Sequence, residues 1–142
     1  LAMTESDDIL VEEFIDGKEF TCGLVKISGE KIVFPVTEVI PQNEFFDYEA
    51  KYVAGKTDEI TPARISPELT KKIQQLSAKI YDLCDCSGIV RIDYILKNGE
   101  FYFLEVNTTP GMTATSFVPQ QIAAMDRKLS DVLGLLIEDK LK

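Results

Sequence analysis

The segment FYFLEVNTTPGMT, residues 101–113, constrains the fold more than any other part of the chain. Its first half is apolar and aromatic, which is typical of a buried strand. Glu105 and Asn107 interrupt this half two residues apart, so they share one face of the strand. Pro110 and Gly111 then end it. A core strand that carries a carboxylate and an amide near its end predicts a polar site where the strand stops.

A second strand candidate precedes Asn98-Gly99, the strongest hairpin signal in the sequence. A two-residue loop there would set charged residues opposite apolar ones on both faces of the hairpin. A three-residue loop that begins one residue earlier and closes with a glycine bulge sets Arg91 opposite Glu105 and Asp93 opposite Phe103. We therefore predict the three-residue loop. It gathers Arg91, Asp93, Glu105 and Asn107 on one face and leaves to the other Val90, Ile92, Tyr94, Tyr102, Leu104 and Val106.

Two interpretations of this polar face follow from the residues alone. Two carboxylates and an amide oxygen on an open sheet face form a hard-oxygen site of the kind that Mg²⁺ prefers, with positions left for water and phosphate. Alternatively, Arg91 and Glu105 form a cross-strand ion pair on a solvated face, worth under about 1 kcal/mol. The loop that follows favours the first interpretation, because it is rich in hydroxyls and contains Gly111, whose backbone N–H can approach a ligand. Arg91 adds a cationic fork suited to a developing oxyanion.

The remaining pattern predicts an α+β fold, an antiparallel β-sheet with helices packed on one face. Strands are expected over residues 9–15, 20–27, 31–40, 88–96 and 100–106, with turns at Asp16-Gly17 and Ser28-Gly29. Residues 41–63 lack periodicity and are expected to form a functional lid. Three helices are expected. The first follows the N-cap Ser66 and turns one apolar stripe inward: Leu69, Ile73, Leu76, Ile80 and Leu83. The second is expected over residues 120–125, and the third over residues 129–142 with Ser130 as N-cap.

Charge and residue usage exclude several classes of protein. The chain has 142 residues, 24 acidic and 15 basic, and its net charge of -9 argues against a nucleic-acid partner. It contains no histidine, the commonest zinc ligand, so a metal site must use oxygen ligands. Cys22, Cys84 and Cys86 are expected to be reduced core thiols of a cytoplasmic protein. No apolar run approaches the about 20 residues of a membrane helix, so no membrane partner is expected.

Four segments in this order and spacing resemble one family. VEEFIDGKEFT, which begins at Val11, EFFDYEAKY, RIDYIL and FLEVNTTPGMT are similar to the C-terminal half of the ATP-grasp domain of D-alanine:D-alanine ligases. The resemblance extends from Val11 to the last helix. It implies a ligase that uses ATP and Mg²⁺, or Mn²⁺, to join two D-alanines through an acyl phosphate for peptidoglycan synthesis. This chemistry needs no protein nucleophile.

The resemblance also implies roles for single residues, carried over motif by motif. On the nucleotide side, Glu12 would accept from the adenine amino group, the backbone of Glu13 to Ile15 would line the adenine edge, and Glu19 would bind the ribose. Lys51 in the lid would reach the ATP phosphates, and Tyr52 would close over the substrates.

On the substrate side, the polar face takes the central roles. Asp93, Glu105 and Asn107 match the magnesium ligands. Arg91 and the Gly111 backbone match the groups that hold the tetrahedral intermediate. Ser116 matches the hydroxyl that binds the carboxylate of the second D-alanine.

The half of an ATP-grasp site that supplies the glycine-rich phosphate loop has no match in this chain. We therefore expect a C-terminal fragment, inactive alone, with a lead-in over 1–8 of natural or cloning origin and the subdomain over 9–142. Its expected partners are D-alanine and the missing N-terminal part of the ligase, and an uncovered face would favour self-association. Two alternatives stay open: a related ligase for other amino or hydroxy acids, and a non-catalytic module that retains the half-site.

Overall fold

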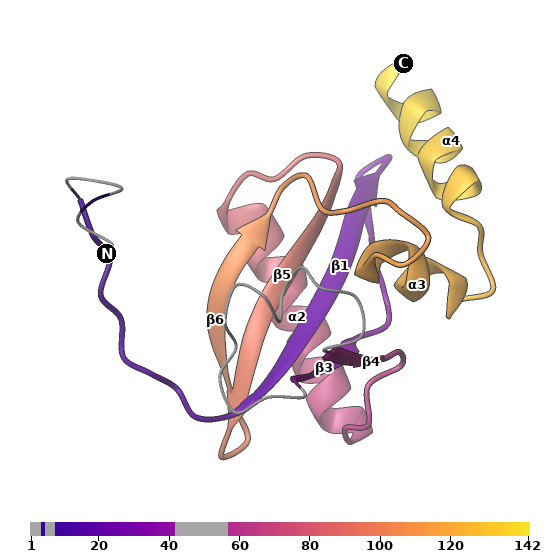
Figure 1. The fold of residues 1–142 in the computed structure, drawn as a ribbon. Helices are drawn as coiled ribbons and strands as arrows, with labels where there is room; N and C mark the ends of the chain where they lie inside the picture. Colours follow the sequence, from indigo (N-terminus) through magenta and orange to yellow (C-terminus); the bar gives the residue numbers. More distant parts are fainter. Residues whose placement is uncertain (1–3, 5–7, 42–56) are drawn as a thin grey trace.

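The computed structural model of the chain describes residues 4, 8–41 and 57–142, and its elements are shown in Figure 1. They are β1 (Lys18–Ile27), β2 (Glu30–Val33), β3 (Thr37–Pro41), β4 (Thr57–Ile60), α2 (Pro67–Leu83), β5 (Ile89–Lys97), β6 (Glu100–Asn107), α3 (Phe117–Ala123) and α4 (Leu129–Lys140). The strands form one antiparallel sheet in the order β4-β3-β1-β5-β6, with β2 also paired to β1. The predicted α+β class, with helices packed on an antiparallel sheet, is confirmed. No helix in the described part of the chain is long and apolar enough to cross a membrane.

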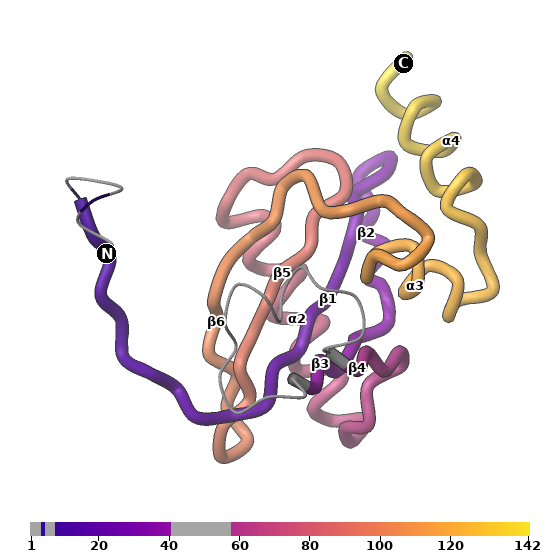
Figure 2. Tube along the Cα trace, in the orientation of Figure 1, coloured from indigo at the N-terminus to yellow at the C-terminus, as the bar shows by residue number. Residues whose placement is uncertain are grey.

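The predicted strand over residues 9–15 and its turn at Asp16-Gly17 are wrong. Residues 8–16 have no regular structure, and Leu10, Val11 and Phe14 are 81%, 87% and 85% exposed. Figure 2 shows this stretch running away from the sheet. The strand that was expected to pair with it is β1, and both edges of β1 are already occupied. One edge pairs with β5 and the other with β2 and β3, so neither edge of β1 is open to a further strand.

The single strand predicted over residues 31–40 is divided into β2 and β3. Pro35 lies between the two, and proline cannot donate to a strand ladder. Both pieces still pair with the same edge of β1, and the Phe34 N–H donates to Gly23 O at 2.8 Å. β4, which was not predicted, pairs with β3 within the region expected to form a lid. Residues 42–56 of that region lie outside the described part of the chain.

α2 covers one face of the sheet as predicted. Ser66 caps it, since its side chain accepts from the Leu69 N–H at 3.3 Å. The helix buries Ile73, Ser77 and Tyr81 against a core that also contains Phe20, Cys22, Leu24, Val36, Val90, Ile92 and Tyr94. Leu83, expected inward, is the last residue of the helix and is 73% exposed, so that part of the prediction is wrong.

α3 and α4 pack at one end of the opposite face, so the prediction that the helices lie on one face of the sheet is wrong. They form a second cluster of Val25, Phe34, Ile89, Val118, Ile122 and Val132. Val25 follows Leu24 of the first cluster directly in β1, and alternation along a strand puts the two on opposite faces. α3 begins at Phe117, three residues before its predicted start, and the N-cap of α4 is Lys128 instead of Ser130.

The β5–β6 hairpin closes with two residues, so the predicted three-residue loop is wrong. Lys97 pairs with Glu100 directly across it. Asn98 and Gly99 both have positive φ, 53° and 80°, as in a type I′ turn. The two-residue turn is favoured over the three-residue loop because its twist matches the right-handed twist of the strands it joins.

A bulge in β6 restores the polar face that the loop was expected to create. Tyr94 pairs with Phe103 but Asp93 pairs with Glu105, so Leu104 is the extra residue of the bulge. From Glu105 onward, the pairing of β6 with β5 is therefore shifted by one residue. Arg91 consequently pairs with Asn107. The predicted pairs Arg91–Glu105 and Asp93–Phe103 are therefore wrong, although Asp93 and Glu105 do share one face.

The same change of register alters which aromatic residues face the core. Phe101 and Phe103, and not Tyr102 and Leu104, lie on the side of α2, where both rings contact Tyr94 edge to face. Tyr102 pairs with Ile95 on the opposite, polar face and is 42% exposed.

A buried carboxylate at the edge of the core makes a pH-dependent contribution to stability. Glu38 on β3 is 3% exposed, and Arg64 Nε donates to it at 2.9 Å, with Lys18 Nζ 3.8 Å away. The hydrogen bond from Arg64 lowers the pKa of Glu38 below 4.5, outweighing the opposite effect of burial. A lowered pKa stabilises the fold above about pH 4.5, and this stabilisation is lost as pH falls through the folded-state pKa.

We expect Glu38→Gln to lower stability at neutral pH, and the gap between variant and wild type to close in acid. Urea unfolding of both proteins at about pH 7 and about pH 3 measures this. A gap that stays constant between the two pH values would mean that the ionisation of Glu38 does not stabilise the fold.

Candidate active site

Asp93 is the centre of a polar cluster on the face opposite α2. Its Oδ1 accepts from Thr21 Oγ1 at 2.6 Å and from Arg91 Nε at 2.9 Å. Its Oδ2 accepts from Arg91 Nη2 at 2.8 Å and from Asn107 Nδ2 at 3.0 Å. A carboxylate offers about four lone-pair positions, so the carboxylate of Asp93 is saturated with donors.

The central strands bring these residues together. β1 pairs Thr21 with Asp93, and β5 and β6 pair Asp93 with Glu105 and Arg91 with Asn107. Directly paired residues of antiparallel strands lie on the same face, so all five side chains point one way. Of the four predicted residues, Arg91, Asp93 and Asn107 are linked by direct hydrogen bonds, and Glu105 joins them through Asn107 at 3.4 Å.

Arg91 is held rigidly between an acid and a ring. Its side chain is 15% exposed, and its Cζ lies 5.1 Å from the centre of the Phe117 ring. Burial alone would lower the pKa of Arg91, but the hydrogen bonds and charge of Asp93 outweigh it and raise the pKa. The guanidinium therefore keeps its charge and its orientation.

The donor set fits a hard divalent cation. No group of three or more His, Cys, Asp or Glu residues that could hold a metal occurs in the described segments, so a metal here would also need the amide of Asn107. Asn107 Nδ2 lies between the carboxylates, 3.0 Å from Asp93 Oδ2 and 3.4 Å from Glu105 Oε1. It bridges two anions, as a cation would. Oxygen ligands from two carboxylates and an amide suit Mg²⁺.

The loop after β6 joins this cluster to the start of α3. A Cβ on Gly111 would lie 2.7 Å from Ser116 Oγ, so the absence of a side chain lets the two approach. Ser116 occupies the N-cap position of α3, but its hydroxyl does not cap the helix and instead lies 2.8 Å from Thr113 Oγ1. Phe117, the next residue, contacts Arg91. Gly111 and Ser116 are therefore tied to the same part of the sheet as the cluster.

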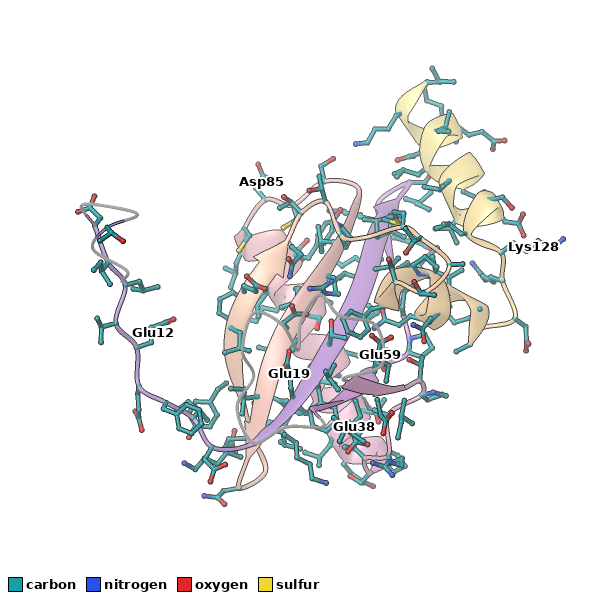
Figure 3. All side chains as sticks on the ribbon, viewed as in Figure 1. Glu12, Glu19, Glu38, Glu59, Asp85 and Lys128 are labelled. Atoms are coloured by element: carbon teal, nitrogen blue, oxygen red, sulfur yellow. The ribbon has the colours of Figure 1, made fainter. Side chains whose placement is uncertain are left out.

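The residues predicted for the nucleotide are only partly brought to this face. Glu19 lies on β1, two residues before Thr21 and so on the same face, and its charge raises the pKa of Arg91. Glu12 and Glu13 are exposed on the stretch that leaves the sheet, with Ile15 half-buried. Figure 3 shows Glu12 well away from Glu19. Lys51 and Tyr52 lie outside the described residues.

Sequence reasoning missed two buried polar residues next to the cluster, Thr21 and Gln121. The amide of Gln121 on α3 accepts from the Gly23 N–H at 3.0 Å and donates to Thr21 O at 3.2 Å and Thr37 Oγ1 at 3.1 Å. Gln121 is fully buried and joins α3 to β1 and β3. Alternation from Glu19 would have placed Thr21 on the correct face, but its pairing with Asp93, 72 residues away, has no local signal.

The cysteines are unpaired, as expected, but only one is a core thiol. Burial raises the pKa of Cys22 to about 12, so the thiol stays protonated at neutral pH. Cys86 is half-buried and Cys84 is exposed at the end of α2. None of the three lies in the polar cluster.

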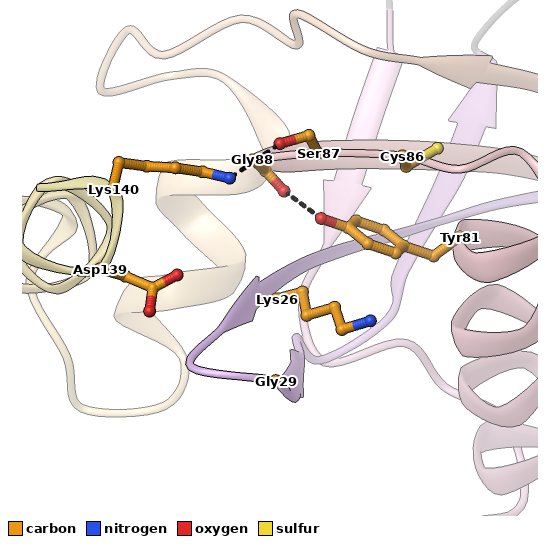
Figure 4. A pocket seen from close by; sticks show the side chains of 8 residues that line it. All are labelled: Lys26, Gly29, Tyr81, Cys86, Ser87, Gly88, Asp139 and Lys140. Atoms are coloured by element: carbon orange, nitrogen blue, oxygen red, sulfur yellow. Dashed lines mark hydrogen bonds between the residues drawn. The ribbon is translucent and has the colours of Figure 1, made fainter. Parts of the chain in front are cut away.

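A separate cavity of about 220 Å³ opens beside the β1–β2 turn. Its lining contains no residue of the predicted site: Lys26, Gly29, Tyr81, Cys86, Ser87, Gly88, Asp139 and Lys140. Figure 4 shows Lys140 Nζ reaching Ser87 Oγ and the Tyr81 hydroxyl reaching Gly88 O. Asp139 accepts from the N–H and hydroxyl of Ser28. The contacts of Lys140 and Asp139 fasten α4 to the β1–β2 turn and to the segment before β5.

Comparison with known proteins identifies the family of the chain. Residues 1–138 match the family model described as D-ala D-ala ligase C-terminus. The chain is 54% identical over 140 residues to the D-alanine–D-alanine ligase of Bacteroides fragilis, which covers 98% of this chain and 43% of that protein. The chain thus spans less than half the length of the curated relatives it matches.

Solved structures give the same result. The D-alanine–D-alanine ligase of Bacillus anthracis complexed with ATP has a TM-score of 0.73 and 34% identity, covering 92% of this chain and 41% of that one. A D-Ala:D-Ser ligase from Enterococcus faecalis has a TM-score of 0.74 and 37% identity, covering 89% and 37%. The predicted resemblance is confirmed.

Proposed function

Because the chain belongs to the family of D-alanine–D-alanine ligase C-terminal domains, we propose that it is the second ATP-grasp subdomain of such a ligase. The whole enzyme joins two D-alanines through an acyl phosphate, with ATP and Mg²⁺, in the cytoplasm and for peptidoglycan precursors. Residues 9–142 form the subdomain. The remaining part of the same enzyme supplies the other wall of the nucleotide and substrate site.

One observation of the structure carries this proposal. Asp93, Glu105 and Asn107 lie side by side on one sheet face, next to an arginine whose position is fixed. An acyl phosphate and the amide made from it both form through charge on phosphoryl and carbonyl oxygens. Fixed cationic and metal-binding groups are therefore what the reaction needs, and a protein nucleophile is not.

Asp93, Glu105 and Asn107 are the residues that would hold magnesium. Magnesium, when bound, neutralises charge on the phosphate oxygens of ATP. Asp93 is held by donors on both oxygens, so it adopts one orientation before any ligand arrives. Asn107 can present its amide oxygen in place of Nδ2 by rotation of the side chain.

Arg91 and the backbone N–H of Gly111 would stabilise the oxyanion of the tetrahedral intermediate. Arg91 suits this role because Asp93 and Phe117 fix its plane before reaction, which avoids the cost of reorganisation. Ser116, whose hydroxyl is free of helix capping, would bind the carboxylate of the second D-alanine.

The nucleotide-side roles remain proposals of the same kind. Glu12 and the backbone of Glu13 to Ile15 would line the adenine, and Glu19 would bind the ribose. Lys51 and Tyr52, outside the described residues, would contact the phosphates and close the site. The exposed stretch that carries Glu12 would be ordered by the remaining part of the enzyme, with apolar Leu10, Val11 and Phe14 as contacts.

A second candidate function concerns the acceptor. The D-Ala:D-Ser ligase structure, at 37% identity and a TM-score of 0.74, is as similar to this chain as the D-alanine–D-alanine ligase structure at 34% and 0.73. The acceptor could then be another amino or hydroxy acid, with Arg91 and the cation site unchanged. A non-catalytic module with a retained half-site is the third candidate, and it would not need a saturated Asp93 beside an oriented Arg91.

We expect the full-length enzyme to form D-alanyl-D-alanine at about 1 to 1,000 per second, and the 142-residue chain to show no turnover. Turnover requires ATP and both amino acids to be enclosed between two subdomains. Phosphate release and dipeptide formation with ATP, magnesium and D-alanine measure both.

Competing acceptors separate the candidates in the same assay. D-serine, D-lactate and D-alanine are compared at equal concentration by kcat/KM. Preference for another acceptor would replace D-alanine in the proposal. A full-length enzyme that binds ATP but turns over none of the acceptors would support the non-catalytic module.

A further inference from the structure

The two oxygens of Asp93 are not equivalent. Oδ1 accepts from Thr21 and from Arg91 Nε, and it faces β1. Oδ2 accepts from Arg91 Nη2 and Asn107, and through Asn107 it is connected to Glu105. A cation shared by Asp93 and Glu105 must therefore bind at Oδ2.

The donors also differ in whether a cation can replace them. Thr21 is 1% exposed in the central strand of the sheet, and its backbone is fixed on both edges by pairing with Asp93 and Thr37. Asn107 ends the edge strand β6, is half-buried, and bonds to the carboxylates through one amide nitrogen. Turning that amide removes a donor from Oδ2 and offers an oxygen. The Thr21 hydroxyl has one other acceptor, Ile92 O, but this lies 3.5 Å away, against 2.6 Å for Asp93 Oδ1.

The hydrogen bond from Thr21 to Asp93 is expected to remain when a cation binds. At 2.6 Å it is a short, charge-assisted hydrogen bond between two buried groups. Gln121 also fixes the backbone around Thr21. Its Nε2 donates to Thr21 O, and its Oε1 accepts from the Gly23 N–H. The backbone that carries the hydroxyl is consequently tied to α3, the helix that begins directly after Ser116.

We propose that Thr21 is a positioning residue for the cation site: its hydroxyl occupies Oδ1 of Asp93 and so keeps Oδ2 turned toward Glu105 and Asn107. This inference rests on the proposed function, because it concerns the cation that Asp93, Glu105 and Asn107 would hold. Thr21 itself touches neither cation nor substrate. Its effect is on the orientation of a ligand, as with other residues that hydrogen-bond a metal-binding carboxylate.

The test compares variants of the full-length ligase that carries this domain. Mn²⁺ binding in the presence of a non-hydrolysable ATP analogue is followed by electron paramagnetic resonance, without turnover. Thr21→Val should weaken Mn²⁺ binding about 10- to 100-fold. It should also raise the magnesium concentration needed for half-maximal activity. Thr21→Ser, which keeps the hydroxyl, should restore binding close to wild type.

Thr37→Val is the matched control. Thr37 is the cross-strand partner of Thr21, equally buried, and its hydroxyl bonds to Gln121 and Thr61 but not to Asp93. Both valine variants remove one buried hydroxyl, so both should lower the thermal midpoint. Only Thr21→Val should change Mn²⁺ affinity. If it does not fold, Thr21→Ala, which also removes the hydroxyl, carries the same expectation.

The outcomes separate this inference from the function on which it rests. If wild type binds Mn²⁺, Asp93→Asn abolishes the binding, and Thr21→Val binds as tightly as Thr37→Val, then the positioning role is wrong and the cation site stands. If Thr21→Ser is as weak as Thr21→Val, the hydroxyl is not the active feature and the inference also fails. If wild type binds no Mn²⁺ with the nucleotide, the proposed cation site and the inference fall together.

Discussion

Glu105→Gln in the full-length ligase should lower dipeptide synthesis about 1,000-fold, equivalent to about 4 kcal/mol of transition-state stabilisation. The substitution keeps the size of the side chain but removes the charge that would help to hold magnesium. Glu105 is exposed on the edge strand β6, so the thermal midpoint should move little. Dipeptide formation with saturating ATP and thermal unfolding of the same preparation measure the two effects.

Asp93→Asn is the informative comparison, because Asp93 has a structural role as well. It is 6% exposed and is the ion-pair partner of Arg91, which is itself largely buried. Removing one partner of a buried pair costs about 3 kcal/mol or more. Asp93→Asn should therefore lose activity and also stability, whereas Glu105→Gln loses activity alone. Near-normal synthesis by Glu105→Gln would exclude this carboxylate from the metal site.

Gly23→Ala should destabilise the 142-residue chain by about 3 kcal/mol or more, a large part of an ordinary folding free energy of about 5 to 15 kcal/mol. A Cβ at Gly23 would lie 2.5 Å from Gln121 Oε1, 2.7 Å from Phe34 Cδ2 and 3.3 Å from Val118 Cγ2. All three neighbours are fully buried, and Gln121 is held by hydrogen bonds, so none can move freely. Urea unfolding measures the loss.

Gly134→Ala supplies the control for that substitution. Gly134 lies inside α4, and a Cβ there would have no atom within 4 Å. Alanine in a helix interior is favoured over glycine by about 0.5 to 1 kcal/mol, so this variant should be slightly more stable than wild type. If Gly23→Ala were as stable as Gly134→Ala, α3 would not approach β1 as closely as the structure indicates.

Features whose causes lie within a few residues of one another could be predicted without the structure. Ser66 caps α2, and the apolar repeat behind it selects the helix and its buried face. Asn98-Gly99 is sufficient for a hairpin, and two-residue alternation is sufficient to put Arg91 beside Asp93 and Glu105 beside Asn107. The family of the chain also follows from the order of short motifs, because each motif is read without knowing what packs against it.

The alignment of those features with one another depends on long-range packing, which the local pattern does not contain. A bulge at Leu104, and not a longer loop, brings Asp93 opposite Glu105, and both arrangements are compatible with the same local sequence. Residues 9–15 have the apolar pattern of a strand, but they do not pair with β1. Both edges of β1 are occupied by β2, β3 and β5, which follow it in the sequence.

Thr21 and Gln121 were missed for the same physical reason. A threonine or a glutamine has no functional signature of its own, and its role depends on the atoms that reach it. Thr21 and its partner Asp93 are 72 residues apart in the sequence, and Thr21 and Gln121 are 100 residues apart. Such contacts result from the summed packing of the sheet and its helices, and strand register and burial are set by that packing and not by the local sequence.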